Sequence, residues 1–171
     1  MSLPLRESFQ LSAVIGDQLV ETRVPPAAEL LGMVRRGEIW QEASIYPTTA
    51  DYPRANLSFL EGRGFVLQCY EDETCLSDFL VRTDELSDPQ LEIELGGQAL
   101  ERWPPELFVP EALVTEAFEW FLDSGKRKPN LCWVRIDRFP REIVWEGEEG
   151  RKAWEERRDL LSGEMNSRGD S

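Results

Sequence analysis

The sequence predicts an α+β fold: a mostly antiparallel sheet, a long amphipathic helix packed on one face of it, and additional peripheral helices. Short segments of alternating apolar and polar residues recur along the chain, and Gly and Pro turns separate them. One longer segment, residues 110–125, instead repeats its apolar residues at helical spacing. The chain has 171 residues, of which 41% are hydrophobic, so it is long enough to bury one core.

The first third of the chain predicts strands, a short helix and another strand. Residues 8–15 and 20–24 predict two strands, because Gly and Asp between them favour a turn. Two prolines open a helical segment at 25–38, where Pro is tolerated in the first turn, and Gly37 ends it. A strand at 42–46 then runs into a proline-containing loop.

The clearest β signal is a hairpin formed by residues 56–60 and 65–70 around the glycine-containing turn 61–64. A strand repeats every two residues, so alternate apolar positions share one face. These positions are Leu57 and Phe59 in the first strand, and Phe65, Leu67 and Cys69 in the second. Further strands are expected at 75–82, 91–95 and 98–103, which makes the sheet mostly antiparallel.

Residues 110–125 form the best helix of the sequence. Pro110 suits the first helical position, and Gly125 suits a left-handed cap. The expected sheet-facing stripe consists of Leu113, Val114, Ala117, Phe118, Trp120 and Phe121. A final core strand follows at 131–137, with Cys132, Val134 and Ile136 on one face and Leu131 and Trp133 on the other.

The end of the chain is polar. Residues 148–161 predict a helix with few apolar side chains to dock it, and residues 162–171 predict a disordered tail. We therefore expect one α+β domain over residues 1–161. The Arg-Gly-Asp triplet at 168–170 is interpreted as a chance match, because so short a motif recurs often.

Charge restricts the kind of partner. The formal net charge is −14, which disfavours direct binding to nucleic acid and to anionic membranes and favours a basic protein partner. Residues 71–106 carry eleven Asp or Glu and two Arg, a net of −9, whereas residues 126–141 carry a net of +5. The molecule is therefore expected to be electrically polar, although solvated faces would also explain both runs.

The sequence lacks the residues that several classes of catalysis require. There is no histidine, which removes the usual near-neutral base, and no phosphate-binding or hydrolase motif appears. The three cysteines, Cys69, Cys75 and Cys132, form no CxxC pair and fit reduced thiols. We expect no catalysis, no cofactor and no metal. The amino terminus lacks the features of a secretory signal, so a cytoplasmic location is expected.

The expected partner-binding residues are acidic side chains and one tryptophan near two prolines: Glu71, Asp72, Glu73, Asp84, Glu85, Asp88 and Trp103. Carboxylates would meet a basic surface, and large aromatic side chains are favoured at interface hot spots. Trp103 lies in a segment that we expect to be an exposed loop.

Residues 109–137 contain a series of motifs that can be compared with a known protein family. An amphipathic helix, a Phe-Leu-x-x-Gly end, a basic residue, a Pro and a strand bearing Trp occur here as Phe121, Leu122, Gly125, Lys128, Pro129 and Trp133. This arrangement resembles the immunity family numbered one among the bacterial polymorphic-toxin immunity proteins. The upstream hairpin is also similar, so the resemblance covers roughly residues 55–137. It implies an α+β protein that binds and blocks a cognate toxin, often a nuclease or nucleic-acid deaminase, without a cofactor.

Two hypotheses of function remain. The first is an immunity protein that neutralises a toxin by stoichiometric inhibition through its acidic surface. The alternative is a non-catalytic adaptor or structural interaction protein of a secretion or phage-like assembly. An immunity gene should lie beside a toxin gene, and its loss should be lethal only while the toxin is present. An enzyme would instead require convergent carboxylates or thiols in a pocket, and no spacing in the sequence indicates them.

Overall fold

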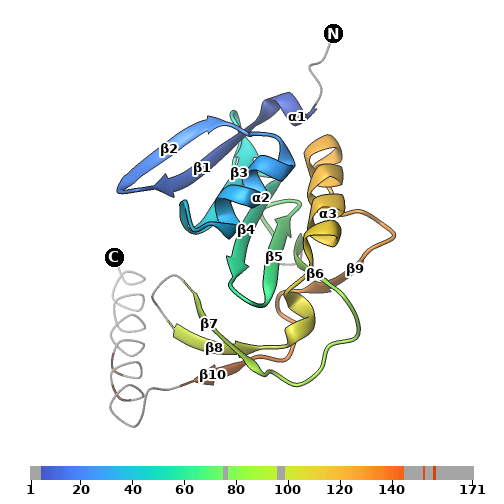
Figure 1. The fold of residues 1–171 in the computed structure, drawn as a ribbon. Helices are drawn as coiled ribbons and strands as arrows, with labels where there is room; N and C mark the ends of the chain where they lie inside the picture. Colours follow the sequence, from blue (N-terminus) through green and yellow to red (C-terminus); the bar gives the residue numbers. More distant parts are fainter. Residues whose placement is uncertain (1–4, 75–76, 96–98, 145–151, 153–155, 157–171) are drawn as a thin grey trace, which may run out of the picture.

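The computed structural model describes residues 5–74, 77–95, 99–144, 152 and 156, and it confirms the α+β class (Figure 1). Helices and strands follow one another in mixed order along the chain. In order they are α1 (Leu5–Ser8), β1 (Phe9–Ile15), β2 (Gln18–Arg23), α2 (Ala27–Arg35), β3 (Ile39–Pro47), β4 (Arg54–Leu60), β5 (Gly64–Tyr70), β6 (Asp78–Arg82), β7 (Leu91–Leu95), β8 (Ala99–Trp103), the 3-10 helix η2 (Pro105–Leu107), α3 (Glu111–Ser124), β9 (Cys132–Arg135) and β10 (Glu142–Val144).

The described strands form two antiparallel sheets. The larger has seven strands in the order β2-β1-β3-β4-β5-β6-β9, and the smaller has three in the order β10-β8-β7. The predicted hairpin is the β4–β5 pair, in which Leu57 lies opposite Leu67 and Phe59 opposite Phe65. The smaller sheet was not predicted as a separate layer, because strand patterns do not show which strands pair.

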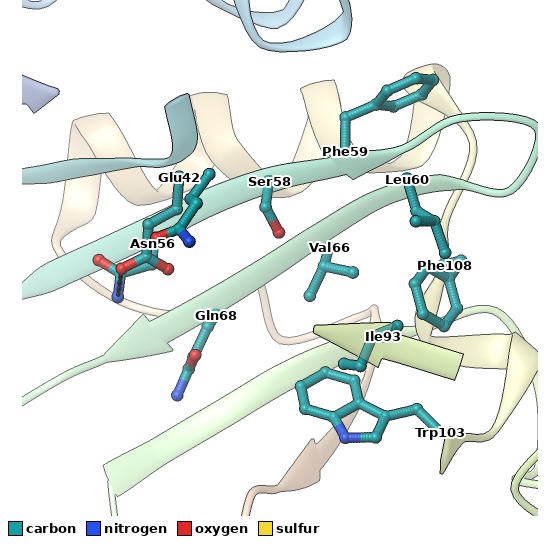
Figure 2. Close-up of a pocket in the computed structure, with 11 residues that line it drawn as sticks. Glu42, Asn56, Ser58, Phe59, Leu60, Val66, Gln68, Ile93, Trp103 and Phe108 are labelled. Atoms are coloured by element: carbon teal, nitrogen blue, oxygen red, sulfur yellow. Dashed lines mark hydrogen bonds between the residues drawn. The ribbon is translucent and has the colours of Figure 1, made fainter. Parts of the chain in front are cut away.

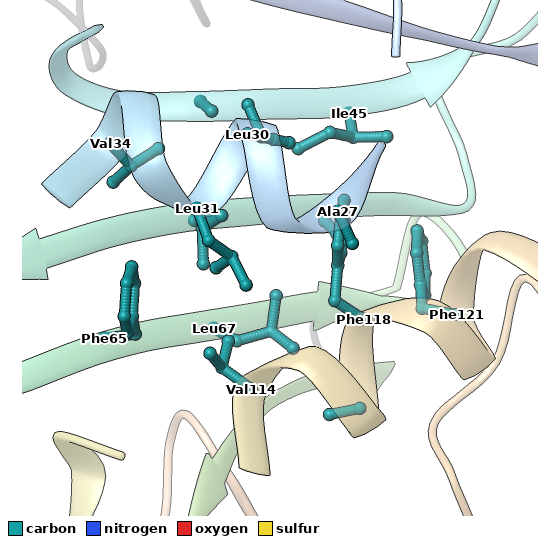
Figure 3. Packing of buried hydrophobic residues seen from close by; sticks show 14 of the residues in the cluster. Ala27, Leu30, Leu31, Val34, Ile45, Phe65, Leu67, Val114, Phe118 and Phe121 are labelled. Carbon is teal, nitrogen blue, oxygen red and sulfur yellow. The ribbon is translucent and has the colours of Figure 1, made fainter. Parts of the chain in front are cut away.

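One face of the seven-stranded sheet is covered by α2 and α3, which lie side by side on it (Figures 1 and 3). Apolar side chains from alternate strand positions meet the apolar sides of both helices. The largest fully buried members of this main core are Phe9, Leu11, Leu30, Leu31, Ile45, Leu57, Phe65, Leu67, Phe118 and Phe121. Removing this apolar area from water is the main source of stability for such a layer.

Helix α3 follows the prediction at its end and departs from it on one side. Gly125 caps the helix at φ 67°, in the left-handed region, and a Cβ there would lie 2.8 Å from Pro53 Cγ. Trp120, expected to face the sheet, is instead 41% exposed, and Leu122 is buried. The buried side of the helix is therefore rotated toward Leu122 relative to the predicted stripe, and the Trp120 ring lies 5.8 Å from the Lys128 ammonium.

The opposite face of the large sheet has a smaller hydrophobic cluster at one end. Leu80 of β6 and Val66 of β5 pack there against side chains of the small sheet. The buried members are Leu80, Ile93, Trp103, Leu107, Phe108 and Phe139. The rest of this face carries polar side chains from β1, β3, β4 and β5, at the positions between the buried ones. We call this part the open face.

Strand boundaries and faces agree in most places with the expectations. Strand β9 is shorter than the predicted 131–137, but Leu131 and Trp133 do pack on the main core, while Val134 and Ile136 pack on the smaller cluster. Cys132 is exposed, because β9 is an edge strand. Neither α1 nor β10 was predicted, since both are very short.

The predicted helix 148–161 and the tail 162–171 lie outside the described residues, apart from positions 152 and 156. Residues 75 and 76, the predicted start of the strand 75–82, are also outside them, and β6 begins at Asp78. None of the helices in the described ranges combines the length and the apolar composition that a membrane crossing requires.

Candidate partner-binding surface

The acidic residues predicted to bind a partner lie in two separate places. Glu71, Asp72 and Glu73 belong to the loop before β6, and the other three carboxylates belong to the loop after it. A strand rises about 3.3 Å per residue, so the five residues of β6 separate the two loops by roughly 17 Å. The two acidic groups therefore do not form one continuous patch through β6.

Glu71 forms an ion pair within the protein. Its Oε1 accepts hydrogen bonds from Arg127 Nε at 2.9 Å and from the Arg127 backbone N–H at 3.1 Å, and both side chains are half-buried. The Arg127 guanidinium also lies 3.3 Å from the centroid of the Phe79 ring. The acidic and basic stretches of the sequence thus meet at this pair, so they are not the fully separated poles that the sequence suggested.

Asp72 organises its own loop. Its Oδ1 accepts hydrogen bonds from the Thr74 hydroxyl at 2.5 Å, from the Ser77 hydroxyl at 2.7 Å and from the Thr74 backbone N–H at 2.8 Å. These donors, the Thr74 hydroxyl first, lower the pKa of Asp72 because they favour the ionised form. Glu73 is exposed and has no ion pair with a described residue. Of the three neighbours, Glu73 is therefore the one free to meet a partner.

The loop after β6 keeps its carboxylates in solvent. Asp84 and Asp88 are exposed and form no ion pair with a described residue, and Glu85 is exposed with a 3.5 Å ion pair to Arg82. The loop is anchored by Glu106, whose Oε2 accepts hydrogen bonds from the Ser87 backbone N–H and hydroxyl at 3.1 and 3.0 Å. This anchored loop presents three carboxylates of the predicted set.

Trp103 is not the exposed loop residue that the sequence suggested. It ends β8, is only 3% exposed and packs edge-on against Phe139 with ring centroids 4.9 Å apart. Its indole N–H donates a 2.8 Å hydrogen bond to Oε2 of Glu101, which is itself buried. The neighbouring prolines suggested a loop, but Trp103 belongs to the central strand of the small sheet, and its ring lies in the smaller hydrophobic cluster with Leu80 and Ile93.

The sequence did not predict a groove on the open face. A groove of about 410 Å³ lies between β3, β4 and β5 of the large sheet and the small sheet (Figure 2). One end is polar and the other apolar. Its lining is Gln41, Glu42, Asn56, Ser58 and Gln68 at the polar end, with Phe59, Leu60, Val66, Ile93, Trp103 and Phe108 on the apolar side.

Glu42 lies at the groove because it pairs with Ser58 of β4 and so faces the same side as Ser44, next to a bulge of β3 against β1. Between the pairs Ser12–Ser44 and Val14–Trp40, β3 contains two more residues than β1, and Gln41 adopts φ 60°, which is unusual for a residue other than glycine. Partial burial raises the pKa of the Glu42 carboxyl, and Arg54 opposes the rise. Solvent still reaches Glu42, and among the described residues its carboxylate accepts one hydrogen bond, from Asn56 Nδ2, at a long 3.4 Å.

All three tyrosines of the chain gather beside this groove around Arg54. The Arg54 guanidinium lies 4.9 Å from the Tyr46 ring centroid and 6.0 Å from that of Tyr52, which in turn lies 6.4 Å from Tyr70. The Arg54 Nε is buried and has no hydrogen-bond partner among the described residues. Burial raises the pKa of Tyr70 to about 12, and the carboxylates of Asp78 and Glu42 add to the rise. Tyrosine and arginine are enriched among interface hot spots.

Alternation could have indicated part of this surface. In the hairpin strands, the positions between the apolar ones are Asn56, Ser58 and Gln68, so their polarity marks the face opposite the core. The same alternation in β3 puts Glu42 and Ser44 opposite the buried Ala43 and Ile45, but the groove itself depends on how the small sheet packs beside these strands.

Two further observations concern the described thiols and carboxylates. Cys69 is buried, and this burial raises the pKa of its thiol far above the usual value, which makes the thiol unreactive. Within the described residues, no group of three or more Cys, Asp or Glu could hold a metal ion.

Comparison with known protein families finds no match to this sequence, and no curated protein matches it either.

Proposed function

We propose that this protein is an immunity protein that binds a cognate bacterial toxin and neutralises it by stoichiometric inhibition. The toxin would be a basic protein, as nucleases and nucleic-acid deaminases that grip phosphate are. Occupation of its cleft by an acidic surface would exclude the nucleic acid. The resemblance to the immunity family numbered one motivates the class, and the exposed acidic loops support it.

The observation that carries the proposal is the large uncompensated negative charge. The net charge is −14, and Glu73, Asp84 and Asp88 are exposed without an ion pair to a described residue. A field of this sign attracts a basic partner over about 10 Å in 0.1 M salt and raises its association rate. An adaptor protein would have no specific need for such a charge.

The positions that carry the resemblance are consistent with a structural role. Phe121 and Leu122 are buried, Gly125 caps α3, and the Trp133 indole N–H donates a 3.0 Å hydrogen bond to the Lys128 carbonyl oxygen. These residues shape the fold, so contact residues must be sought elsewhere on the surface.

Growth rescue combined with pull-down tests the proposal. The protein is co-expressed with the toxic domain encoded beside it, and we expect growth to be restored and a one-to-one complex to form. A charge-reversed variant, Glu73→Lys, Asp84→Lys and Asp88→Lys, should associate at least about tenfold more slowly, with a smaller change in dissociation. Glu71 is left intact because its loss would break the pair with Arg127.

The matched control reverses three exposed carboxylates elsewhere, Asp17, Glu29 and Asp51, so that the change in net charge is the same. If both triple variants slow association equally, only the total charge matters and the two loops are not the interface. Absence of both rescue and complex with the wild-type protein would overturn immunity for that toxin.

A further inference from the structure

The groove between the two sheets combines features that suit one kind of side chain. Glu42 and the amides of Asn56 and Gln68 lie at one end, and Val66, with the small-sheet residue Ile93, forms part of the apolar wall (Figure 2). An Arg or Lys side chain matches these two ends, because its cationic head suits the carboxylate and its methylene groups can be buried along apolar surface.

The carboxylate in this groove is not neutralised by an ion pair within the described residues. Glu42 forms no ion pair with a described residue, and the nearby Arg54 lies against tyrosine rings instead. A partly desolvated carboxylate gains more from an incoming cation than an exposed one does, since the surroundings screen the attraction less. An acidic or purely apolar ligand would leave this carboxylate uncompensated or further desolvated, which costs free energy.

We propose that this groove receives an arginine or lysine side chain of the partner protein, whose cation pairs with Glu42 while its stem lies along Val66 and Ile93. This inference rests on the proposed function for the identity of the partner, a basic toxin. It adds a specific contact to the long-range attraction of the exposed loops. The charge of the chain, −14, favours a basic occupant over an acidic one.

A small probe tests the groove without any toxin. Nα-acetyl-arginine N-methylamide is titrated into the isotope-labelled full-length protein, and amide and indole signals are followed by NMR. We expect the Trp103 indole and the Asn56 and Gln68 side-chain amides to shift, with a dissociation constant on the order of 1 mM. The uncharged citrulline counterpart should bind at least about tenfold more weakly, and the arginine probe should bind the Glu42→Gln variant equally weakly.

A second experiment measures how tightly variants of this protein bind the toxic domain. Glu42→Gln should raise its dissociation constant on the order of 30-fold, the loss expected when one partner of a desolvated charge pair is truncated. Ser58→Tyr fills the groove without changing charge and should weaken binding comparably. Glu29→Gln removes one exposed carboxylate from α2, on the opposite face of the sheet, and should change the constant less than about twofold.

The probe titration and the toxin-binding experiment together distinguish failure of the groove proposal from failure of the immunity proposal. If the toxic domain binds but the probe causes no shifts and Glu42→Gln binds normally, the groove proposal is overturned and the immunity proposal stands. If the probe binds as expected and no toxic domain does, the groove stands and the immunity proposal fails. Equal binding of the arginine and citrulline probes would show an apolar site and overturn the role of Glu42.

Discussion

The two faces of the seven-stranded sheet are built from the same strands but meet different surroundings. Along β5, Phe65, Leu67 and Cys69 point toward α2 and α3 and are buried, whereas Val66 and Gln68 point to the other side and line the groove. The helix-covered face is apolar and closely packed. The open face is polar, carries the tyrosine cluster and holds a groove whose carboxylate, Glu42, forms no ion pair with a described residue.

The contrast between the faces indicates which residues can change without unfolding the protein. Side chains on the covered face contribute burial, so their loss leaves cavities. Side chains on the open face contribute little to the core, which leaves them free to be selected for binding. Substitutions on each face test this contrast, and the most costly of them lies in the main core.

Phe118→Ala should be the most damaging of these substitutions. Phe118 is fully buried on α3 against the sheet, and removal of a buried aromatic ring costs about 3–5 kcal/mol of unfolding free energy. Urea denaturation followed by circular dichroism measures this loss. Asn56→Ala on the open face is the control, expected to cost under about 1 kcal/mol. Similar losses in both variants would remove the distinction between the two faces.

Trp103→Phe tests the assignment of Trp103 to the core of the smaller cluster. The ring volume is largely kept, but the buried carboxylate of Glu101 loses the indole donor, which costs about 1–3 kcal/mol. Thermal unfolding should show a lower midpoint. The double variant Trp103→Phe with Glu101→Gln should recover part of the loss, because no charge is then left buried. A stability equal to that of the wild type would indicate that Trp103 is exposed.

Asp78→Asn tests the buried carboxyl of the open face through pH. Burial raises the pKa of Asp78 in the folded state, although the Gln68 Nε2 donor, 2.8 Å from Oδ1, opposes the rise. A raised carboxyl pKa means that the folded state favours the protonated form, so this group contributes stability at low pH. That contribution is lost as the pH rises from the unfolded pKa, about 3.9, through the folded value.

The variant should therefore be more stable than the wild type at pH 7, and the difference should vanish below about pH 4. Urea midpoints measured from about pH 3 to pH 8 give the comparison. Asp88→Asn, at an exposed carboxyl, is the control and should show no such dependence. A variant that is less stable at pH 7 would show that the charged form of Asp78 stabilises the fold.

Trp40→Ser should have the smallest effect on stability although it removes a large aromatic side chain. Trp40 is 62% exposed on the open face of β3, so the expected change is within about 0.5 kcal/mol. Ile45→Ala, on the covered face of the same strand, should cost about 2–5 kcal/mol. A cost for Trp40→Ser above about 1.5 kcal/mol would mean that the ring is covered in solution.

Much of the secondary structure was predictable because its signals are local. Alternation identified β4 and β5, and the Pro and Gly at its ends identified α3. The short elements β10 and α1 carry too few residues for a periodic signal. The strand at β8 was predicted, but its burial was not, because the small sheet brings β10 from 40 residues further along the chain beside it.

The candidate site was less predictable. The exposed carboxylates Glu73, Asp84 and Asp88 could be identified from charge alone, since acidic side chains without partners stay in water. Glu71 could not be distinguished from them, because its partner Arg127 is 56 residues away in sequence. The predicted exposure of Trp103 was wrong for the same reason: a residue's exposure depends on what packs over it.

Local sequence and composition account for the α+β class, the hairpin at β4–β5, the helix ending at Gly125 and the strongly negative charge. Each of these depends only on neighbouring residues or on residue counts. Tertiary contacts were needed to establish that Trp120 stays exposed, that Glu71 pairs with Arg127, and that Glu42 lines a groove between two sheets. Those features arise where distant segments meet, and local propensity carries no information about such contacts.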